Sequence, residues 1–335
     1  MISRCGDVRL VHDKNAARSF PGKPSQLKSF DLAAAAALAL CSVLMLPWAP
    51  AASAPLPGGA LEQRCWSRHT RDRTKVDLRE PTAVHFSNLR DGYEVRSPFV
   101  VEFAVRGMGV APAGVQIDRT GHHHILIDRS LPSSTSAQLP FDNSHRHFGK
   151  GQTSTVLDLP AGRHTLRLLF ADHEHRPYFV FSREIAITVR GPRNVVAAPA
   201  IDPVRYDTSC DTWYQEEVSR PHTPATNNAE QLYFANVRAG ERLTSPFNLH
   251  LGVDGLGVSA RGGTAPKTGH FVLEAYGAGN GKLVESFNLS GGATQANLYI
   301  PVGEYRLRLR LVNNAGTDLL PAHDISVSVV AQDRY

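Results

Sequence analysis

Three consecutive histidines stand at the start of an apolar stretch, in the sequence TGHHHILI at Thr120–Ile127. More histidines follow, and eight of the 15 in the chain lie between residues 122 and 175. Neutral imidazole nitrogens are common ligands of divalent transition metals, zinc and copper above all. Which of these rings could face one ion depends on the strands and turns that carry them.

A second copy of the same sequence frame lies further along the chain and has few of these histidines. VHFSNLRDG at 84–92 matches LYFANVRAG at 232–240, and the histidine segment matches TGHFVL at 268–273, both 148 positions later. Beyond that segment the spacing falls to 141, so that PAGRHTLRL at 160–168 matches PVGEYRLRL at 301–309. Because the second copy keeps the frame without the histidines, their enrichment in the first copy indicates a site.

Both copies consist of short alternating stretches separated by Gly and Pro turns, without a helical period. RLRLRLV at 306–312 places its leucines on one face and its arginines on the other. In the first copy we predict six strands, at about 83–88, 98–105, 122–127, 153–159, 163–170 and 178–189. The expected fold class is all-β, with two tandem immunoglobulin-like β-sandwich domains, and a closed barrel is the alternative architecture.

The N-terminal segment has the composition of a secretory signal. Six Lys/Arg residues precede an apolar run at 32–46, and small residues with an A-x-A pattern follow at 52–54. We expect a signal peptide over residues 1–54 that is cleaved near Ala54, which leaves no membrane span in the mature form. A retained anchor is the rival interpretation, but the apolar run is short for a bilayer. The protein is then periplasmic or secreted.

The repeat also sets the expected domain boundaries. They are a lead-in at 55–82 with Cys65, a His-rich domain at 83–190, a linker at 191–230 with Cys210, and a degenerate repeat at 231–335. Export favours a disulfide between Cys65 and Cys210, the alternative being two free or partner-bound thiols. Loss of the signal peptide lowers the net charge from +5 to +2, because six Lys/Arg and three Asp/Glu are removed. No cluster of Lys/Arg with interleaved aromatics indicates nucleic-acid binding.

Strand periodicity divides the histidine triplet between two faces. His122 and His124 fall on one face, and His123 falls on the other with the inward apolar residues that follow it. His123 aligns with Phe271 of the second copy. It is therefore either a structural imidazole in the core or an alternate ligand.

The predicted chain direction brings two further histidine pairs to the end where the 122–127 strand begins. One pair precedes the 153–159 strand, and the other follows the 163–170 strand, which returns to the same end. His164 begins its strand at the opposite end and aligns with Tyr305, so we expect it to be structural. The predicted metal ligands are His122, His124, His145, His147, His173 and His175. The predicted hydrogen-bond partners of these ligands, or alternate ligands, are His123, Asp128, Asp172 and Glu174.

A set of imidazoles with an occasional carboxylate fits Cu(II) or Zn(II). A sulfur-based Cu(I) site is not expected, because the first copy has one methionine, Met108, and no cysteine. The alternative function is a non-catalytic adhesion or scaffold module that contacts an envelope protein partner through a solvated or pH-sensing histidine patch. A metal hydrolase or oxidase with Glu174 as general base is chemically adequate. We do not expect an enzyme, because the chain lacks an HExxH motif, a nucleophile elbow and a Gly-rich phosphate loop.

Three blocks of the first copy occur in a fixed order: GHHHILID at 121–128, HFGKGQT at 147–153 and LPAGRHTLRLLFADHEH at 159–175. In these blocks the chain resembles the bacterial family known as domain of unknown function 4399, over about residues 83–190. The second copy resembles the family in its scaffold and lacks most of the histidines. The resemblance implies an exported bacterial protein and no particular reaction.

Overall fold

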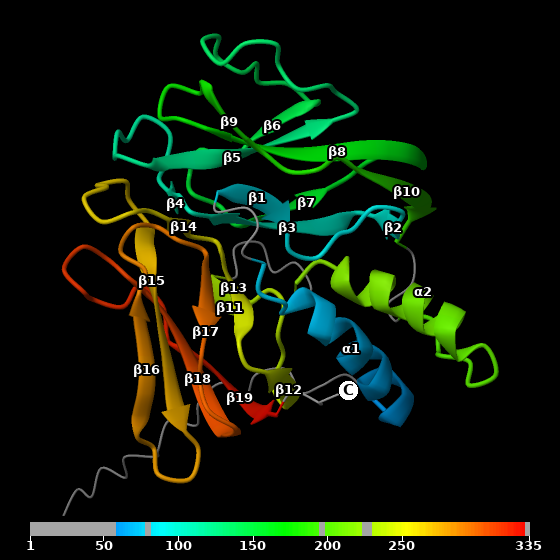
Figure 1. Ribbon diagram of the computed structural model, residues 1–335. Coiled ribbons are helices and arrows are strands. Elements are labelled where there is room, and N and C mark those ends of the chain that lie inside the picture. Colours follow the sequence, from blue (N-terminus) through cyan, green and yellow to red (C-terminus); the bar gives the residue numbers. More distant parts are fainter. Residues whose placement is uncertain (1–57, 78–81, 194–197, 223–229, 332–335) are drawn as a thin grey trace, which may run out of the picture. The chain divides into compact units, whose positions relative to one another are not determined.

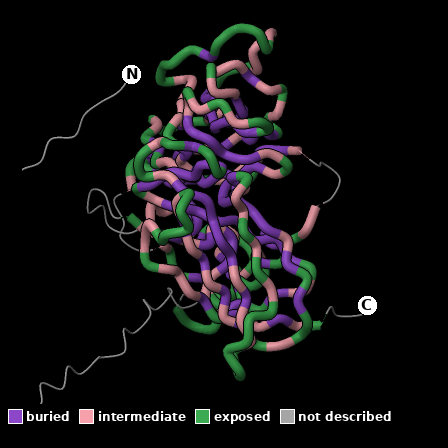
Figure 2. The backbone as a smooth tube through the Cα atoms, turned by 90° about the vertical axis from the view of Figure 1, so that its left-hand side faces the viewer, coloured by how far each residue is buried: buried purple, intermediate pink, exposed green. Residues whose placement is uncertain are grey.

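The described part of the chain contains two β-sandwiches, one for each sequence copy (Figure 1). The structure is a computed structural model, and it describes residues 58–77, 82–193, 198–222 and 230–331. The expected signal peptide at 1–54 lies outside the described residues. Buried stretches run through the interior, and exposed stretches lie mostly at the periphery (Figure 2).

The first sandwich consists of two sheets. The smaller sheet has the order β1-β3-β7, with β1 at Ala83–Phe86, β3 at Phe99–Arg106 and β7 at Ser154–Leu157. The larger sheet has the order β2-β10-β8-β5-β4, with β2 at Glu94–Ser97, β10 at Ile185–Pro192, β8 at Gly162–Ala171, β5 at Thr120–Ile127 and β4 at Gly109–Val110. Two further strands join it, β6 at His145–His147 on β5 and β9 at Pro177–Phe181 on β8.

The second sandwich has the same strand order, but among the described residues it lacks an equivalent of β9. Its smaller sheet is β11-β13-β17, with β11 at Gln231–Phe234, β13 at Phe247–Asp254 and β17 at Gln295–Leu298. Its larger sheet is β12-β19-β18-β15-β14, with β12 at Glu241–Thr244, β19 at His323–Val330, β18 at Gly303–Val312, β15 at Thr268–Gly277 and β14 at Gly257–Val258. β16 at Leu283–Asn288 pairs with β15. The all-β fold of two sandwiches is thereby confirmed.

The core of each sandwich follows the alternation of its strands. In β18 the side chains of Leu307, Leu309 and Leu311 are fully buried, and the arginines between them are half-buried on the other face. Burial of each leucine contributes about 1.5–3 kcal/mol relative to an exposed one. The period-two pattern of this segment therefore fixes which face of the sheet packs inward.

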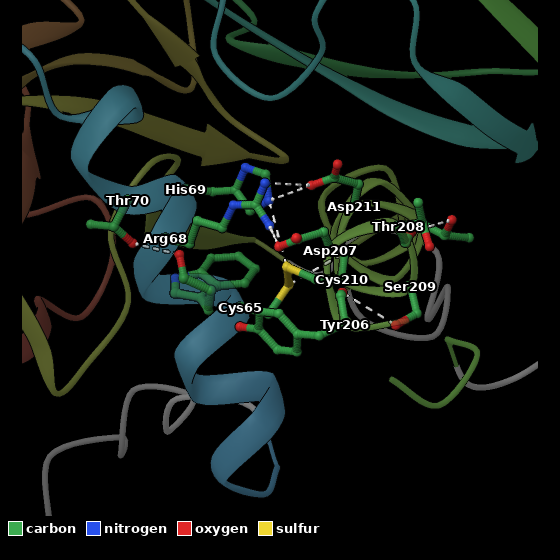
Figure 3. The surroundings of a disulfide bond; sticks show 12 residues. Cys65, Arg68, His69, Thr70, Tyr206, Asp207, Thr208, Ser209, Cys210 and Asp211 are labelled. Atoms are coloured by element: carbon green, nitrogen blue, oxygen red, sulfur yellow. Dashed lines mark hydrogen bonds and ion pairs between the residues drawn. A yellow bond between two sulfur atoms is a disulfide. The ribbon is translucent and has the colours of Figure 1, made fainter. Parts of the chain in front are cut away.

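Two helices that the sequence analysis did not predict lie outside the sandwiches. α1 at Ala60–Arg73 belongs to the lead-in and α2 at Tyr206–Val218 to the linker, and the predicted disulfide between Cys65 and Cys210 joins them (Figure 3). In α1 an acidic residue lies in the first turn and two arginines lie in the last, which suits the helix dipole. Within the described residues neither helix is long and apolar enough to cross a membrane.

Each helix packs on the sandwich of the other copy. After α1, the carbonyl of Thr74 accepts a hydrogen bond from the backbone N–H of Asn248 in β13, at 2.7 Å. After α2, the carbonyl of Ser219 accepts one from the backbone N–H of Val100 in β3, at 2.9 Å. The two acceptor positions are 145 residues apart, as are the two cysteines. The disulfide therefore joins equivalent positions of two exchanged helices.

Hydrogen bonds between the sandwiches also come in equivalent pairs. The backbone N–H of Val105 donates to Oγ1 of Thr294, and that of Val253 donates to Oγ1 of Thr153, both at 3.0 Å. These residues correspond through the spacings of 148 and 141 that define the repeat. The two sandwiches thus contact each other through the same face of each, with approximate two-fold symmetry, as the subunits of an isologous dimer do.

Glycines permit the closest approach in this contact. The backbone N–H of Val258 donates to the carbonyl of Gly151 at 2.7 Å, and in the equivalent pair Val110 donates to Gly292 at 2.8 Å. Both glycines have φ near +80°. A Cβ on Gly151 would lie 2.1 Å from the carbonyl oxygen of Val258. The position therefore excludes every side chain, both by conformation and by space.

We expect Gly151→Ala to lower the free energy of unfolding by at least about 2 kcal/mol, because a methyl group there forces the two sandwiches apart. Gly92→Ala is the matched control, since Gly92 has nearly the same positive φ, +81°, but has nothing among the described residues within 4 Å of an added Cβ. Urea unfolding of both variants measures the difference. Equal destabilisation would contradict the assignment of Gly151 to a tight contact.

A histidine between two carboxylates also links the sandwiches. His222 Nε2 lies 2.6 Å from Oε1 of Glu102 in β3, and its Nδ1 lies 3.1 Å from Oδ2 of Asp254 in β13. Burial lowers the pKa of His222, but the hydrogen bonds to Asp254 and Glu102 outweigh burial and raise this pKa to about 10. The imidazole is therefore charged at neutral pH and donates to one carboxylate of each sandwich.

This ion pair makes the free energy of unfolding depend on pH in the neutral to alkaline range. The folded-state pKa of His222 lies above the unfolded value of 6.5, so its contribution is complete below pH 6.5 and is lost as the pH rises toward 10. We expect the free energy of unfolding to fall over that range, by about 1.4 kcal/mol per pH unit from this group. His222→Gln should abolish this slope and remove about 3 kcal/mol at pH 7, because Glu102 stays buried without a cation. His145→Gln, on the surface of the first sandwich, should keep the slope.

Candidate metal centre

The histidine triplet lies in a strand that is buried along its whole length. All eight residues of β5 are buried, and His122, His123 and His124 have no exposed surface. β5 pairs with β8 on one side and β6 on the other, which places His124 opposite Leu169 and opposite His147. The outward face of β5, which carries His122 and His124, is therefore shielded from water.

Three imidazoles converge on this outward face. Nε2 of His122 lies 3.1 Å from Nε2 of His124, and one nitrogen from each of His122, His124 and His147 lies within 4.8 Å of the others. Two nitrogens that bind one zinc ion at ~2.0–2.1 Å, at angles of ~90–110°, lie ~3 Å apart. The separation of His122 and His124 therefore already suits two ligands of one ion.

A fourth ring, that of His175, lies beside the same three. Its centroid is 4.8 Å from that of His147, 5.1 Å from that of His122 and 6.2 Å from that of His124. His175 comes from the turn after β8, so three separate segments of the chain contribute to the group. We call His122, His124, His147 and His175 the histidine cluster.

The backbone at His175 adopts a conformation that glycine usually supplies. Its φ is +68°, and the equivalent residue of the second sandwich is Gly316, with φ +80°. Both turns are held in the same way: Oδ1 of Asp172 accepts two backbone N–H groups, as does Oδ1 of Asn313. A histidine in the left-handed region costs about 1 kcal/mol or more. The turn accepts this strain and directs an imidazole toward the cluster.

Burial keeps the rings of the cluster uncharged. Burial, followed by the charges of the neighbouring histidines, lowers the pKa of His122 to about 3 and that of His124 to about 2. The pKa of His147 is lowered for the same reasons. Neutral imidazole is the form that binds metal ions. The cluster is therefore in its ligating state at physiological pH.

Several ring nitrogens of the cluster are buried and have no hydrogen-bond partner in the part of the chain that the structure describes. They are Nδ1 of His122, Nδ1 of His124 and Nε2 of His147. A buried polar atom without a partner is costly, and a bound cation is one of the ways in which such atoms are satisfied. Gly149 makes room for the third ring, since a Cβ there would lie 2.3 Å from Nε2 of His147. The donor atoms and their surroundings fit an imidazole-ligated metal ion.

The connector between β5 and β6 covers the cluster. Leu139 packs on Leu126, Leu169 and Ala171 in a small apolar group of its own. Phe141 lies at the opening, 59% exposed, with its ring centroid 4.9 Å from that of His147 and 4.8 Å from that of His175. Phe141 was not predicted as part of the site. Its position shortly before the His145–His147 segment could have indicated that it lies near the cluster.

His123 points to the other side of β5, into the core of the sandwich. Its ring lies between Phe103 and Phe170, with centroid distances of 4.7 and 5.0 Å, and neither ring nitrogen has a partner. Burial lowers its pKa to about 3. The residue has no access to the cluster, and it occupies the place that Phe271 fills in the second sandwich.

Two of the predicted ligands, His145 and His173, lie outside the cluster. Nδ1 of His145 pairs with Oδ1 of Asp142 at 2.9 Å, and the residue lies opposite Leu126, two positions along β5 from His124. Within the described residues, His173 makes a backbone contact: its carbonyl accepts a hydrogen bond from the N–H of Gly114 at 2.9 Å. The structure thus brings one member of each of these two histidine pairs into the cluster, His147 and His175. The spacing of the pairs in the sequence did not indicate which member it would be.

The carboxylates proposed as partners serve other groups. Asp128 binds Nδ1 of His164 at 2.8 Å, four residues or ~13 Å along the strand from His124. Nε2 of His164 also contacts the carbonyl of Pro160 at 3.0 Å, so this histidine belongs to the turn at the opposite end. Asp172 caps its own turn, and Glu174 pairs with Arg176. None of these four acidic or histidine side chains contacts the cluster within the described residues.

The second sandwich shows the same positions without the cluster. Val272 and Asn288 lie opposite each other in β15 and β16, as His124 and His147 do in β5 and β6. His270, the equivalent of His122, forms a side-chain hydrogen bond with Asn288. The second sandwich thus keeps one histidine at the positions of the cluster and pairs it with a neighbouring side chain, whereas the first sandwich leaves ring nitrogens of its cluster unpaired among the described residues.

Fold and site together define a protein of two immunoglobulin-like sandwiches with a histidine cluster in the first. Comparison with protein families matches residues 101–190 to the family described as Domain of unknown function (DUF4399), which confirms the predicted resemblance. No curated protein matches the chain.

Solved structures with some similarity include several small β-domains. CopC from Methylosinus trichosporium OB3b is 16% identical, with 32% of this chain and 99% of that chain covered and a TM-score of 0.21. Fibronectin(III)-like modules of CbhA from Clostridium thermocellum are 6% identical, with 75% and 98% covered and a TM-score of 0.22. A two-domain fibronectin type-III segment of chicken tenascin is 11% identical, with 74% and 97% covered and a TM-score of 0.16. Scores this low carry no inference about function, and the fold assignment rests on the strand order of the chain itself.

The buried neutral histidines make the metal-free protein sensitive to acid. Folded-state pKa values of about 2 to 3 for His122, His123 and His124 lie below the unfolded value of 6.5, so the unfolded chain takes up protons first as the pH falls. We expect chelator-treated protein to lose about 1.4 kcal/mol per pH unit for each such histidine below pH 6.5. His123→Phe, which introduces the residue of the second sandwich, should make the slope shallower. His173→Gln should not, and a slope unaffected by His123→Phe would contradict the assignment.

Proposed function

We propose that the first sandwich binds one divalent transition-metal ion, Cu(II) or Zn(II), through His122, His124 and His147, with His175 as a fourth donor. The observation that carries the proposal is the convergence of three imidazole nitrogens within 4.8 Å on a buried face. The three come from two strands that pair directly, β5 and β6, and this pairing fixes their mutual position. Little reorganisation is needed to bind an ion.

The donor set supports these two metals. Three or four neutral imidazoles suit tetrahedral zinc or tetragonal Cu(II), and no thiolate or thioether is part of the described cluster. When bound between Nε2 of His122 and Nε2 of His124, the ion would replace the contact that these two atoms make with each other, and it would give Nε2 of His147 the partner that it lacks among the described residues. His122 and His124 hold it from the strand, His147 from the adjacent strand, and His175 from the turn at the opening.

The proposed protein is a binding module and not an enzyme. Asp172 and Glu174, the acidic residues nearest to the cluster in sequence, are engaged in their own turn and with Arg176. A general base with free access to a bound ion would therefore have to come from elsewhere. The disulfide between the two helices supports an exported location, periplasmic or secreted, where disulfides persist.

Metal titration of the purified, chelator-treated protein without a polyhistidine tag tests the proposal. We expect one equivalent of Cu(II) or Zn(II) to bind, and His124→Ala and His147→Ala each to weaken binding by more than about 100-fold, which exceeds the usual effect of residues outside the coordination shell. Calorimetry gives the affinity, and electron paramagnetic resonance of the Cu(II) form reports nitrogen coupling.

His145→Ala and His164→Ala are the matched controls, because both remove a histidine of the first sandwich that lies outside the cluster. Both should retain one equivalent at nearly the original affinity. A stoichiometry near zero in the unchanged protein, or equal losses in controls and cluster variants, would show that the cluster is not a metal site.

A further inference from the structure

A second group of potential metal ligands surrounds the disulfide (Figure 3). One ligand atom from each of Cys65, His69 and Cys210 lies within 4.8 Å of the others. Nε2 of His69 is 3.9 Å from Sγ of Cys210 and 3.4 Å from Oδ1 of Asp211. Two sulfurs, an imidazole and a carboxylate therefore meet where the two helices cross-link.

Helix geometry brings these side chains to one place. Cys65 and His69 are four residues apart in α1 and so lie on the same face of the helix. Cys210 and Asp211 follow one another in α2. A pair of cysteines with a histidine, completed by an oxygen donor, is a common tetrahedral set for zinc.

We propose that Cys65 and Cys210, once their disulfide is reduced, bind a zinc-like divalent ion together with His69 and Asp211. The disulfide and the metal-bound form are then alternative states of the same two sulfurs. The oxidised state cross-links the helices covalently, and the reduced state cross-links them through the ion. Occupancy of this second site is thereby controlled by redox state.

A dithiol is a suitable reductant for the disulfide between Cys65 and Cys210. The dithiol transfers two electrons and two protons to the disulfide, which breaks the S–S bond, forms two protein thiols and leaves the dithiol as a cyclic disulfide. Binding of the divalent ion then displaces one proton from each thiol. The metal step involves no electron transfer, so the ion keeps its charge.

The surroundings keep the ligands in place after reduction. The ring of Trp66 packs against Trp213 and Tyr214, with centroid distances of 6.4 and 5.4 Å, and these contacts join the helices independently of the disulfide. His69 stacks on Tyr214 at 3.8 Å, which fixes its ring. A cavity of about 230 Å³ is lined by His69, Asp211 and Tyr214, so two of the four proposed ligands border it.

The charges around the site suit a neutral imidazole beside two thiolates. Burial, and after it the positive charges of Arg68, Arg73 and Arg90 against the opposing effect of Asp211, lowers the pKa of His69. Thiolate is the form of cysteine that binds metal. Two thiolates and one divalent ion leave no net charge in the buried part of the site.

Cadmium titration of the full chain, oxidised and reduced, tests the proposal. Protein reduced with dithiothreitol and freed of it under anaerobic conditions should bind one more equivalent of Cd²⁺ than oxidised protein. The extra equivalent should show the ultraviolet charge-transfer band of cadmium–thiolate bonds, which imidazole ligands in the histidine cluster do not give. His69→Ala should weaken this equivalent by at least about tenfold, the lower end of what even outer partners contribute.

His173→Ala is the control for loss of a histidine elsewhere and should leave this equivalent unchanged. Far-ultraviolet circular dichroism follows the two helices: if reduction diminishes the helical signal, the equivalent of Cd²⁺ that gives the thiolate band should restore it, because binding and folding are coupled. The proposal is overturned if reduced protein shows no thiolate band. It is equally overturned if His69→Ala binds as tightly as the unchanged chain, since the sulfurs then act as a simple dithiol.

Discussion

Complete burial of β5 is the constraint on which the site depends. An outer strand face of a sandwich normally meets water, yet here the β5–β6 connector and the turn after β8 cover it, and His122 and His124 have no exposed surface. An imidazole in such a place is held neutral, since its charged form would lose its hydration. Nε2 of His122 and Nε2 of His124 can share one proton in a hydrogen bond, but Nε2 of His147 lies in the same cluster without a partner among the described residues. The fold therefore concentrates uncharged nitrogen ligands in a dry place, where several of them can bind one cation.

The second sandwich separates what the scaffold needs from what the cluster adds. The turn held by Asn313 has the same hydrogen bonds as the turn held by Asp172, so the left-handed residue within it is a property of the scaffold. Glycine is the residue that suits this conformation, and the second sandwich has Gly316 there. His175 in the first sandwich is less favourable for the backbone, which indicates that its side chain has a role that outweighs the strain. His124 and His147 are replaced by Val272 and Asn288 in the second sandwich, and the strand pairing is the same. The scaffold therefore does not require these two histidines either.

Alternation and the repeat were enough to predict the all-β fold, the inward direction of His123 and the common end of β5 and β8. They could not separate His147 from His145 or His175 from His173, because that choice depends on the pairing of β6 and on the turn at Asp172, which are set by contacts far apart in sequence. Asp128 was wrongly placed near the cluster for a related reason. It is close to the histidine triplet in sequence, but an extended strand rises by about 3.3 Å per residue and carries it away from the cluster. The two helices gave no clear periodic signal, and their positions depend on packing against the other copy's sandwich. The connector that buries the cluster has no regular pattern from which its path could be predicted.

The segment from His147 to Thr153 explains why the two sandwiches stay together. His147 enters the cluster, Phe148 enters the core, and Gly149 leaves space for the imidazole. Two residues further on, the carbonyl of Gly151 accepts a hydrogen bond from Val258, and Thr153 bonds the backbone of Val253, both in the second sandwich. One short stretch therefore serves the candidate site at one end and the contact between the sandwiches at the other. A stretch anchored at both ends has few alternative conformations, so the second sandwich contributes to the order of the His147 ring even though it has no cluster of its own among the described residues.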